Sequence, residues 1–338
     1  MLTGEVEQRG TVRGGGAGDR RAPRARRRPL AWFAGLLLAG LSVPLTARGM
    51  DADGPTPVPQ LLAFLPWFLA PGWLALLCAV YSRRFLATVW AIAVLVAAGW
   101  FTLPQGPDAV AAGERPAEAR FRVLTANVRY GGATDALLDT LRRERPQLVA
   151  VQECDSRCSG ALRGPTMRQE YPYRVIAEAG GARGTALLSV YPLKDEAAVP
   201  GRMAMPGAVA DISGTRVRVQ TAHAMPPKPA ALASWRAELG RLRDYAASRG
   251  ETPAIVAGDF NSSQDHAAFR AILRTGLHDA ARLTGQSRTP TWPDNRALPL
   301  GAQIDHVLIS EQMTAVEARF LDLPGTDHRA LLADVKLY

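Results

Sequence analysis

The stretch Ala254-Ile-Val-Ala-Gly-Asp-Phe-Asn261 joins a short apolar run to an acidic and an amide side chain. An apolar run of this length, bounded by Pro253 and by polar residues, predicts a buried strand. Asp259 and Asn261 stand at positions i and i+2, so in a strand they would project to the same side. The alternative is that Gly-Asp-Phe-Asn forms only a tight turn.

Three earlier apolar segments also end in groups that bind metal or phosphate, at Asn127, Glu153 and His223. Asp305 and the Asp327-His328 pair follow late in the chain. Singly, such residues have ordinary explanations: a turn asparagine, a solvated glutamate or a structural histidine. Strand ends that meet at one edge of a sheet, however, are a natural place for a functional site.

Periodicity predicts strands and helices throughout the region after Glu114. The expected strands are 121–127, 148–153, 173–178, 184–190, 208–213, 216–223, 254–261, 303–309 and 330–337, and the expected helices are 134–144, 235–248 and 266–275. Hairpins mixed with helices predict an α+β fold, a two-layered β-sandwich with helices outside.

The polar residues suit phosphate ester hydrolysis, which needs a cation, an activated water and a proton donor for the leaving oxygen. Glu153 offers a hard carboxylate to Mg²⁺ or Mn²⁺. Asp259 can take a proton from water while Asn261 holds the phosphate or that water. Asp305 can fix the tautomer of His328, whose imidazolium would stabilise phosphoryl oxygens.

Seven short motifs, in their order along the chain, resemble the endonuclease/exonuclease/phosphatase superfamily, here in a membrane-anchored bacterial form. They are Leu124-Thr-Ala-Asn-Val128, Val151-Gln-Glu153, Gly184-Thr-Ala-Leu-Leu-Ser189, Thr221-Ala-His223, Gly258-Asp-Phe-Asn-Ser262, Ile304-Asp-His-Val-Leu308 and Thr326-Asp-His-Arg-Ala330. The resemblance covers residues 120–338 and implies a four-layered α/β/β/α sandwich with phosphoesterase activity.

The resemblance also implies a metal site. Glu153 would be the principal ligand of Mg²⁺, with Mn²⁺ and Ca²⁺ as alternatives. Asn127 and Asp327 would lie beside the metal and the phosphate, Asn127 serving both as a metal ligand and in substrate binding.

The remaining site residues are assigned from the same resemblance. Asp259 would orient or deprotonate the attacking water, and Asn261 would contact the phosphate. Asp305 would support His328. His223 would serve as a proton donor or phosphate ligand, as in deoxyribonuclease-like and sphingomyelinase-like members.

Two features depart from the family pattern. Cys154 directly follows the expected metal ligand, and an oxidising exterior would favour a Cys154–Cys158 disulfide over two free thiols. The loops between residues 262 and 303 are short, which leaves little material for an insert that grips DNA. Within them, Trp292 is interpreted as a packed loop residue, with a place near the pocket as the alternative.

The first third of the chain has a different composition. From Arg9 to Arg28 there are eight arginines and one acid, which predicts a disordered basic tail over residues 1–28. Three segments of 19 to 21 residues then lack any charge, namely 29–47, 61–81 and 85–103. Each is long enough to cross a bilayer, so three transmembrane helices are expected over 29–103. Buried soluble helices and a cleaved signal peptide are the alternatives.

The arginines predict the orientation. Eight precede the first apolar segment, Arg48 stands alone in the first loop, and Arg83 and Arg84 occupy the second. The positive-inside rule then places the tail in the cytoplasm. After three crossings and a linker over 104–119, the phosphoesterase domain, residues 120–338, would lie outside the cytoplasm. The expected location is therefore the cell membrane, as a multi-pass protein.

The charge does not select a substrate. Residues 1–113 carry 11 Lys and Arg against 6 Asp and Glu, a net charge of +5, and residues 114–338 carry 29 against 25, a net charge of +4. No basic cluster with interleaved aromatics marks a nucleic-acid groove. Nucleic acid, a phospholipid headgroup and a soluble phosphate ester all remain open, and no obligate protein partner is inferred. The alternatives to an external enzyme are a catalytically silent membrane-anchored sensor or scaffold and a cytoplasmic enzyme.

Overall fold

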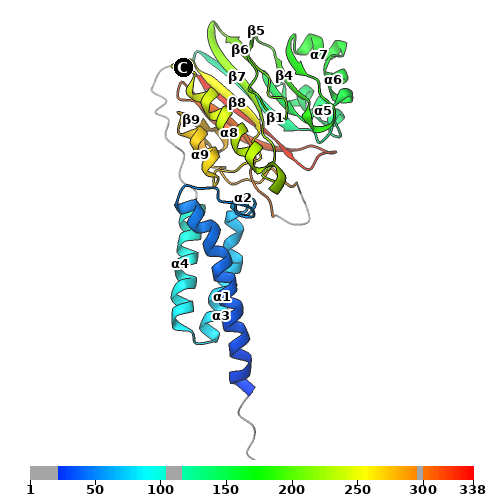
Figure 1. The fold of residues 1–338 in the computed structure, drawn as a ribbon. Coiled ribbons are helices and arrows are strands. Elements are labelled where there is room, and N and C mark those ends of the chain that lie inside the picture. The colour runs from blue at the N-terminus through cyan, green and yellow to red at the C-terminus, as the bar shows by residue number, and fades with distance from the viewer. Residues whose placement is uncertain (1–21, 104–115, 295–299) are drawn as a thin grey trace, which may run out of the picture.

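Three apolar helices form a stalk beneath a larger α+β domain (Figure 1). The computed structural model describes residues 22–103, 116–294 and 300–338. The stalk consists of α1 (Ala22–Gly49), α3 (Leu69–Tyr81) and α4 (Phe85–Thr102), with the short helices α2 (Val58–Leu62) and η1 (Leu65–Phe68) at its domain end. The domain begins with strand β1 at Ala119.

Two six-stranded sheets make up the centre of the domain. The first has the order β11-β12-β1-β2-β4-β3 and the second β5-β6-β7-β8-β10-β9. The strands of the first sheet are β1 (Ala119–Asn127), β2 (Leu148–Gln152), β3 (Tyr173–Ala177), β4 (Thr185–Ser189), β11 (Met313–Asp322) and β12 (Arg329–Leu337). Those of the second are β5 (Leu193–Glu196), β6 (Gly207–Ile212), β7 (Thr215–His223), β8 (Ala254–Asp259), β9 (Leu277–Asp279) and β10 (Asp305–Ser310).

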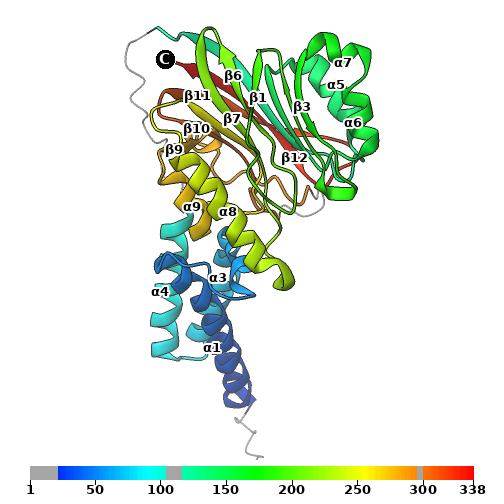
Figure 2. The same cartoon turned by 45° about the horizontal axis from the view of Figure 1, so that its top comes forward.

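The sheets face each other across one apolar core and carry helices on their outer faces (Figure 2). Helices α5 (Thr134–Glu144), α6 (Ser156–Leu162) and α7 (Pro165–Glu170) cover the first sheet. Helices α8 (Leu232–Ala247) and α9 (Ala267–Leu273) cover the second, and α10 (Ala280–Leu283) packs against the central core. The expected α+β sandwich is therefore confirmed, with its layers in the order α/β/β/α.

The sequence missed strand β11, although it pairs with β12 along its whole length. A bulge between Ala315 and Glu317 breaks the register of this pair. Because a bulge shifts every following side chain to the other face of the strand, the apolar alternation that predicts a strand is lost there.

The stalk differs from the expected three full-length spans. Among the described residues, only Arg28–Gly49 and Phe85–Thr102 form helices that are long and apolar enough to cross a membrane, whereas the middle apolar helix runs only from Leu65 to Tyr81. The expected segment 61–81 is interrupted because Pro66, in the first turn of η1, has no amide hydrogen to continue a helix from α2.

The basic tail also differs, since residues 22–28 are helical; residues 1–21 and 104–115 lie outside the described part.

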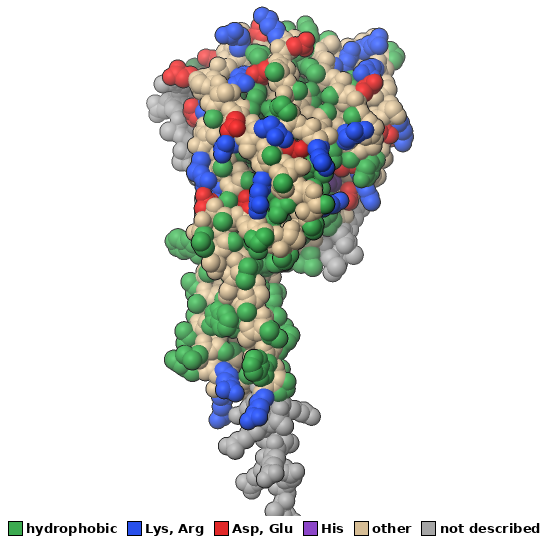
Figure 3. All heavy atoms as spheres, viewed as in Figure 1, with side chains coloured by type: hydrophobic (Ala, Val, Ile, Leu, Met, Phe, Trp, Pro, Cys, Tyr) green, Lys and Arg blue, Asp and Glu red, His purple; other side chains and the backbone are tan. Residues whose placement is uncertain are grey.

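Large apolar side chains point outward along the stalk (Figure 3). Trp32, Leu36, Leu86 and Val96 each expose 65% or more of their surface, while Leu38 and other small or aliphatic residues fill the interior between the helices. Less than a third of each candidate span is buried within the described structure. A soluble protein rarely exposes so continuous an apolar surface.

The domain is fixed to the end of the stalk by buried charge pairs. The Asp265 carboxylate, fully buried, accepts from Arg48 Nε (3.2 Å) at the end of α1 and from both terminal nitrogens of Arg288 (2.5 and 3.1 Å). Arg288 also donates to the carbonyl oxygen of Phe101 in α4 (2.6 Å). The Asp265–Arg288 pair therefore connects the domain to two stalk helices, through Arg48 of α1 and Phe101 of α4.

The loop after α1 adds a second set of contacts. Asp53 accepts from the backbone amides of Ala267 (2.7 Å) and Ala268 (3.1 Å) at the start of α9. The carbonyl oxygen of Pro59 lies 2.8 Å from His266 Nε2. Buried hydrogen bonds of this kind fix the orientation of the domain on the stalk.

Candidate active site

The second sheet brings three of the expected site residues into one row. His223 at the end of β7 pairs in parallel register with Asp259 at the end of β8, and Asp259 pairs in antiparallel register with Asp305 at the start of β10. All three side chains are buried. The expected convergence of polar strand ends at one edge is therefore what the sheet register produces.

The first sheet contributes a second row that faces the first. Asn127 ends β1 and pairs with Gln152, and Glu153 follows Gln152 directly. The Asn127 amide nitrogen donates to Glu153 Oε1 (3.2 Å) and to Asp259 Oδ2 (3.1 Å). One amide thus joins the polar ends of the two sheets.

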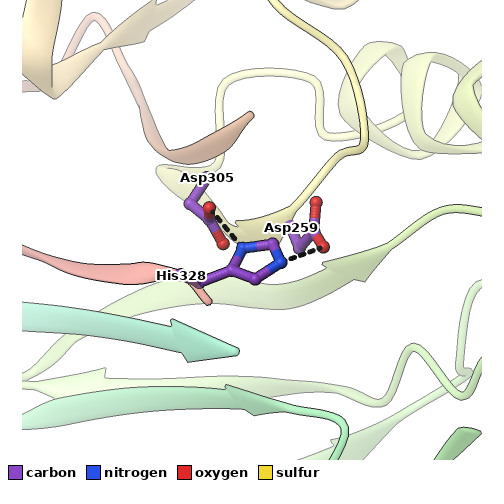
Figure 4. A group of neighbouring side chains, drawn as sticks. All are labelled: Asp259, Asp305 and His328. Carbon is purple, nitrogen blue, oxygen red and sulfur yellow. Dashed lines mark hydrogen bonds and ion pairs between the residues drawn. The ribbon is translucent and has the colours of Figure 1, made fainter. Parts of the chain in front are cut away.

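His328 lies between two carboxylates, as Figure 4 shows. Its Nδ1 donates to Asp305 Oδ2 at 2.9 Å, and its Nε2 lies 4.0 Å from Asp259 Oδ2. His328 immediately precedes β12. Its backbone amide donates to the hydroxyl of Thr326, and that hydroxyl donates to the carbonyl oxygen of Asn127. The structure therefore forms the expected Asp305–His328 pair and adds Asp259 to it.

Burial and charge shift the acidity of this cluster. Burial and the charge of Asp305 raise the pKa of Asp259 to about 7, against the opposing effect of His328. Burial lowers the pKa of His328, but the charge and hydrogen bond of Asp305 outweigh burial and raise it to about 9. Burial, reinforced by the His328 charge, lowers the pKa of His223 to about 3, so this imidazole is neutral. Neighbouring groups whose pKa values are shifted away from their usual values are typical of functional sites.

The backbone at the site demands unusual conformations. A Cβ at Gly258 would lie 1.9 Å from the carbonyl oxygen of Ala222, so only glycine fits before Asp259. Glu153 and Asn261 adopt left-handed conformations with φ of 55° and 47°. Residues other than glycine persist in this region only when the surroundings hold them there, and such residues cluster at functional sites.

Asn261 lies in the loop after β8, whereas the sequence predicts it at the end of the strand. Strand β8 ends at Asp259, so the i, i+2 rule of a strand does not apply to Asn261. Its backbone amide donates to Asp259 Oδ1 (2.8 Å), and its side-chain amide donates to the carbonyl oxygen of Ala224 (2.9 Å). Asn261 therefore orients Asp259, and its amide already has a backbone partner.

Asp327 stands at the open side of the cluster. Its carboxylate accepts from the indole nitrogen of Trp292 (3.1 Å) and lies 3.6 Å from Arg129 Nε. The Trp292 ring also lies near the His328 ring, tilted by 43° with ring centroids 6.5 Å apart. The interpretation of Trp292 as a packed loop residue is wrong, because it contacts two expected site residues.

The donor set at the site fits a divalent cation. Asp259, Asp305 and His328 place one ligand atom each within 4.8 Å of one another, and Asp305 Oδ1 is buried with no hydrogen-bond partner among the described residues. The carboxylate of Glu153 lies on the other side of Asn127. Asn127 turns its nitrogen toward these carboxylates while its oxygen accepts from Arg129 N, so direct ligation by Asn127 would need the amide reversed.

A pocket of about 520 Å³ opens onto these groups. It is lined by the expected site residues Glu153, Asp259, Asn261, Asp327, His328 and His223, and by Trp292, for which a place near the pocket was the alternative interpretation. The other lining residues were not singled out for a site by the sequence: Gln60, Ala63, Phe64, Arg129, Tyr130, Ala182, Met203, Met225, Pro226, Pro227, Lys228, Ala302 and Ile304. Arg129 and Tyr130 carried a sequence signal, since they directly follow the polar end of β1.

A disulfide joins Cys154 to Cys158, next to Glu153. It links the end of the Glu153 segment to α6, whose first turn is capped by the Asp155 carboxylate accepting from Cys158 N (2.9 Å). Cys154 N also donates to the carbonyl oxygen of Gly184 (3.0 Å). The favoured pairing is thus present in the structure, where it supports the backbone beside the site.

A buried Asp–His–Asp arrangement beside a carboxylate-lined pocket is typical of an enzyme that catalyses hydrolysis by proton transfer. The chain belongs to the endonuclease/exonuclease/phosphatase family, whose model matches residues 124–328. The resemblance to this family seen in the sequence is confirmed, while its membrane-anchored bacterial form stays a prediction. Enzymes of this family act on phosphate esters and use divalent metals, which supports phosphate ester hydrolysis here.

Solved structures share the fold of the domain. D. rerio TDP2 complexed with a single-strand DNA product is 17% identical, with a TM-score of 0.53 over 64% of this chain and 99% of that one. An endonuclease/exonuclease/phosphatase from Beutenbergia cavernae is 18% identical, with a TM-score of 0.51 over 64% and 72%. The human Nocturnin catalytic domain with bound sulfate is 17% identical, with a TM-score of 0.51 over 65% and 95%. No curated protein sequence matches the chain.

Proposed function

We propose that the protein is a divalent-metal-dependent phosphoesterase whose domain is tethered to a membrane and faces away from the cytoplasm. The observation that carries the activity is the cluster at the common edge of the two sheets, where Asp259 lies within reach of both Asn127 and His328. Family membership supplies the reaction class.

The geometry supports distinct roles for the chain's own residues. Asp259, held by Asn261 N and by Asn127, orients and deprotonates the attacking water. His328, fixed by Asp305, presents its Nε2 to the phosphoryl oxygens and protonates the leaving oxygen. His223, a neutral imidazole, donates a hydrogen bond to the phosphate.

A divalent cation, most simply Mg²⁺, would neutralise phosphate charge when bound. Glu153 is the principal residue to hold it, because its carboxylate lines the pocket and is oriented by Asn127 and by the amide of Tyr130 (3.1 Å). Asp327 lines the same pocket and would hold the cation through its carboxylate.

The cost of the cluster argues against a silent scaffold. Two carboxylates and two imidazoles are buried together, and burying charge without complete pairing destabilises a fold. A scaffold would gain stability by replacing these groups with apolar residues. Their presence around an open pocket is explained by catalysis.

The activity is tested on the purified full-length protein in detergent. We expect hydrolysis of at least one among bis-p-nitrophenyl phosphate, plasmid DNA, sphingomyelin and a phosphoinositide in the presence of Mg²⁺ or Mn²⁺. Chelation with EDTA should remove the activity and added metal should restore it. Equal rates before and after chelation would contradict the metal requirement, and inactivity on the whole panel would favour the scaffold.

The stalk supports the membrane tether. Its two candidate spans, Arg28–Gly49 and Phe85–Thr102, have 22 and 18 residues and extend about 33 and 27 Å at 1.5 Å per residue, close to the ~30 Å of a hydrocarbon core. Arg28, Arg83 and Arg84 line one hollow between the stalk helices, and Figure 3 shows Lys and Arg side chains at the end of the stalk far from the domain. The positive-inside rule puts that end in the cytoplasm and the domain outside.

The orientation predicts the behaviour of reporter fusions. Alkaline phosphatase fused to the C-terminus should be active, because it folds only after export to an oxidising compartment, and green fluorescent protein exported at the same position should be dark. Reporters placed in the loop at Arg83 should give the reverse pattern. A fluorescent C-terminal fusion with an inactive phosphatase partner would place the domain in the cytoplasm.

A further inference from the structure

The active-site pocket is completed by the stalk. Gln60, Ala63 and Phe64, which we call the stalk wall, line the pocket together with Asp259 and His328. These three residues lie between α1 and α3, and thus outside the family match at residues 124–328. The domain alone would lack one side of its pocket.

The stalk wall is held in place by specific contacts. Gln60 Nε2 donates to the carbonyl oxygen of Pro227, which also lines the pocket. The Trp67 indole nitrogen donates to the carbonyl oxygen of Gly301 (3.0 Å). Phe64 packs on Trp292 with ring centroids 6.4 Å apart, and Trp292 reaches His328. A continuous path of contacts therefore runs from the stalk to the catalytic cluster.

The pocket surface near the wall is apolar. Phe64, Trp292, Met203, Met225 and Ile304 face the same cavity as the carboxylates. Pockets of this size hold a molecule considerably larger than a phosphate group. Aromatic and thioether side chains suit an adaptable apolar group, such as the chain of a lipid.

The pocket also lies beside the domain end of the apolar helices. Phe64 immediately precedes Leu65, the first residue of the apolar helix Leu65–Tyr81. Exposed apolar side chains continue to this end of the stalk at Met50, Trp73 and Trp100, which expose 73%, 57% and 72% of their surfaces. Exposed tryptophans near helix ends are typical of the membrane–water interface.

From this geometry we infer that the substrate is a phosphate ester carried by a membrane lipid, and that the stalk wall holds the apolar part next to the phosphate. This inference rests on the proposed phosphoesterase function and names its substrate class. The lipid enters from the membrane side, its phosphate meets His328 and Asp259, and its first carbons lie against Phe64 and Trp292. The exposed cations Arg129 and Lys228 at the pocket attract the anionic headgroup.

The test compares esters that differ only in chain length. p-Nitrophenyl methyl and p-nitrophenyl dodecyl phosphate serve as diester probes, and butyl and dodecyl phosphate as monoester probes, with full-length protein in mixed micelles. We expect kcat/KM to favour the dodecyl member by at least about tenfold, because each buried methylene contributes a factor of about four. Phe64→Ala should reduce this preference about tenfold, and Phe64→Leu should restore much of it.

Phe85→Ala is the matched control. Phe85 is an equally large apolar residue of the stalk, 77% exposed, at the end far from the pocket. Because micelle partitioning affects both variants alike, this control should keep the wild-type preference. Hydrolysis of the short esters or of plasmid DNA with no chain-length preference would overturn the lipid assignment and leave the phosphoesterase standing. Failure to hydrolyse any ester would overturn both.

Discussion

Asp259→Asn is expected to lower kcat/KM by about 10²–10⁴-fold on every phosphate ester that the wild-type protein hydrolyses. The substitution keeps the shape of the side chain but removes the group that would take a proton from water. Because Asp259 and Asp305 are buried near each other and repel, the variant should melt at the same or a higher temperature. Initial rates at saturating Mg²⁺ and a thermal melt measure the two effects.

The matched control is Asp139→Asn on the exposed face of α5, which should leave the rate unchanged. The Asp305–His328 pair provides a further check. His328→Ala should lose activity to a similar degree, and adding Asp305→Asn should cost little more, because the two residues act as a unit. Additive losses in the double variant would show that Asp305 does not act through His328.

Glu153→Ala is expected to produce a loss of a different kind. Removing the principal oxygen ligand should lower the affinity for the cation by about 10²-fold or more, so activity at low Mg²⁺ collapses. Raising Mg²⁺ or Mn²⁺ should recover part of the rate, since the residues that act on the phosphate and the water remain. A metal titration of the rate measures the shift.

Asp259→Asn provides the contrast, because added metal should not restore its rate. Glu170→Gln, on the exposed end of α7, is the surface control. A Glu153→Ala variant with an unchanged metal titration would move the cation to the Asp259–Asp305–His328 cluster, whose ligand atoms lie within 4.8 Å of one another.

Much of the domain could be predicted because its strands carry their own signals. Helix α5 (Thr134–Glu144) has the predicted bounds, since Pro146 and the spacing of its leucines mark it. Asn127 and Asp259 were predicted at the polar ends of apolar strands. Strand register then places Asp305 beside Asp259, and a hydrogen bond joins Asn127 to Asp259 across the two sheets. A polar residue that ends an apolar strand is visible in the sequence alone.

The rest depends on contacts between distant segments. Trp292 donates to Asp327, 35 residues away, and Phe64 reaches Trp292 across most of the chain. No local pattern encodes such pairs. The left-handed backbone at Glu153 was equally hidden, because glutamate has no preference for it and only tertiary contacts hold it there. The stalk wall was missed for a further reason: segment 61–81 reads as a continuous apolar span.

Hydrolysis in ¹⁸O-labelled water tests the central claim most directly. The full-length protein, with Mg²⁺ and an ester that it cleaves, should release a phosphate product carrying one ¹⁸O atom from solvent, because the account has water activated by Asp259 attacking phosphorus. Asp259→Asn should form this labelled product at least about 10²-fold more slowly. Unlabelled phosphate product, or equal rates of labelling in the two proteins, would contradict the account.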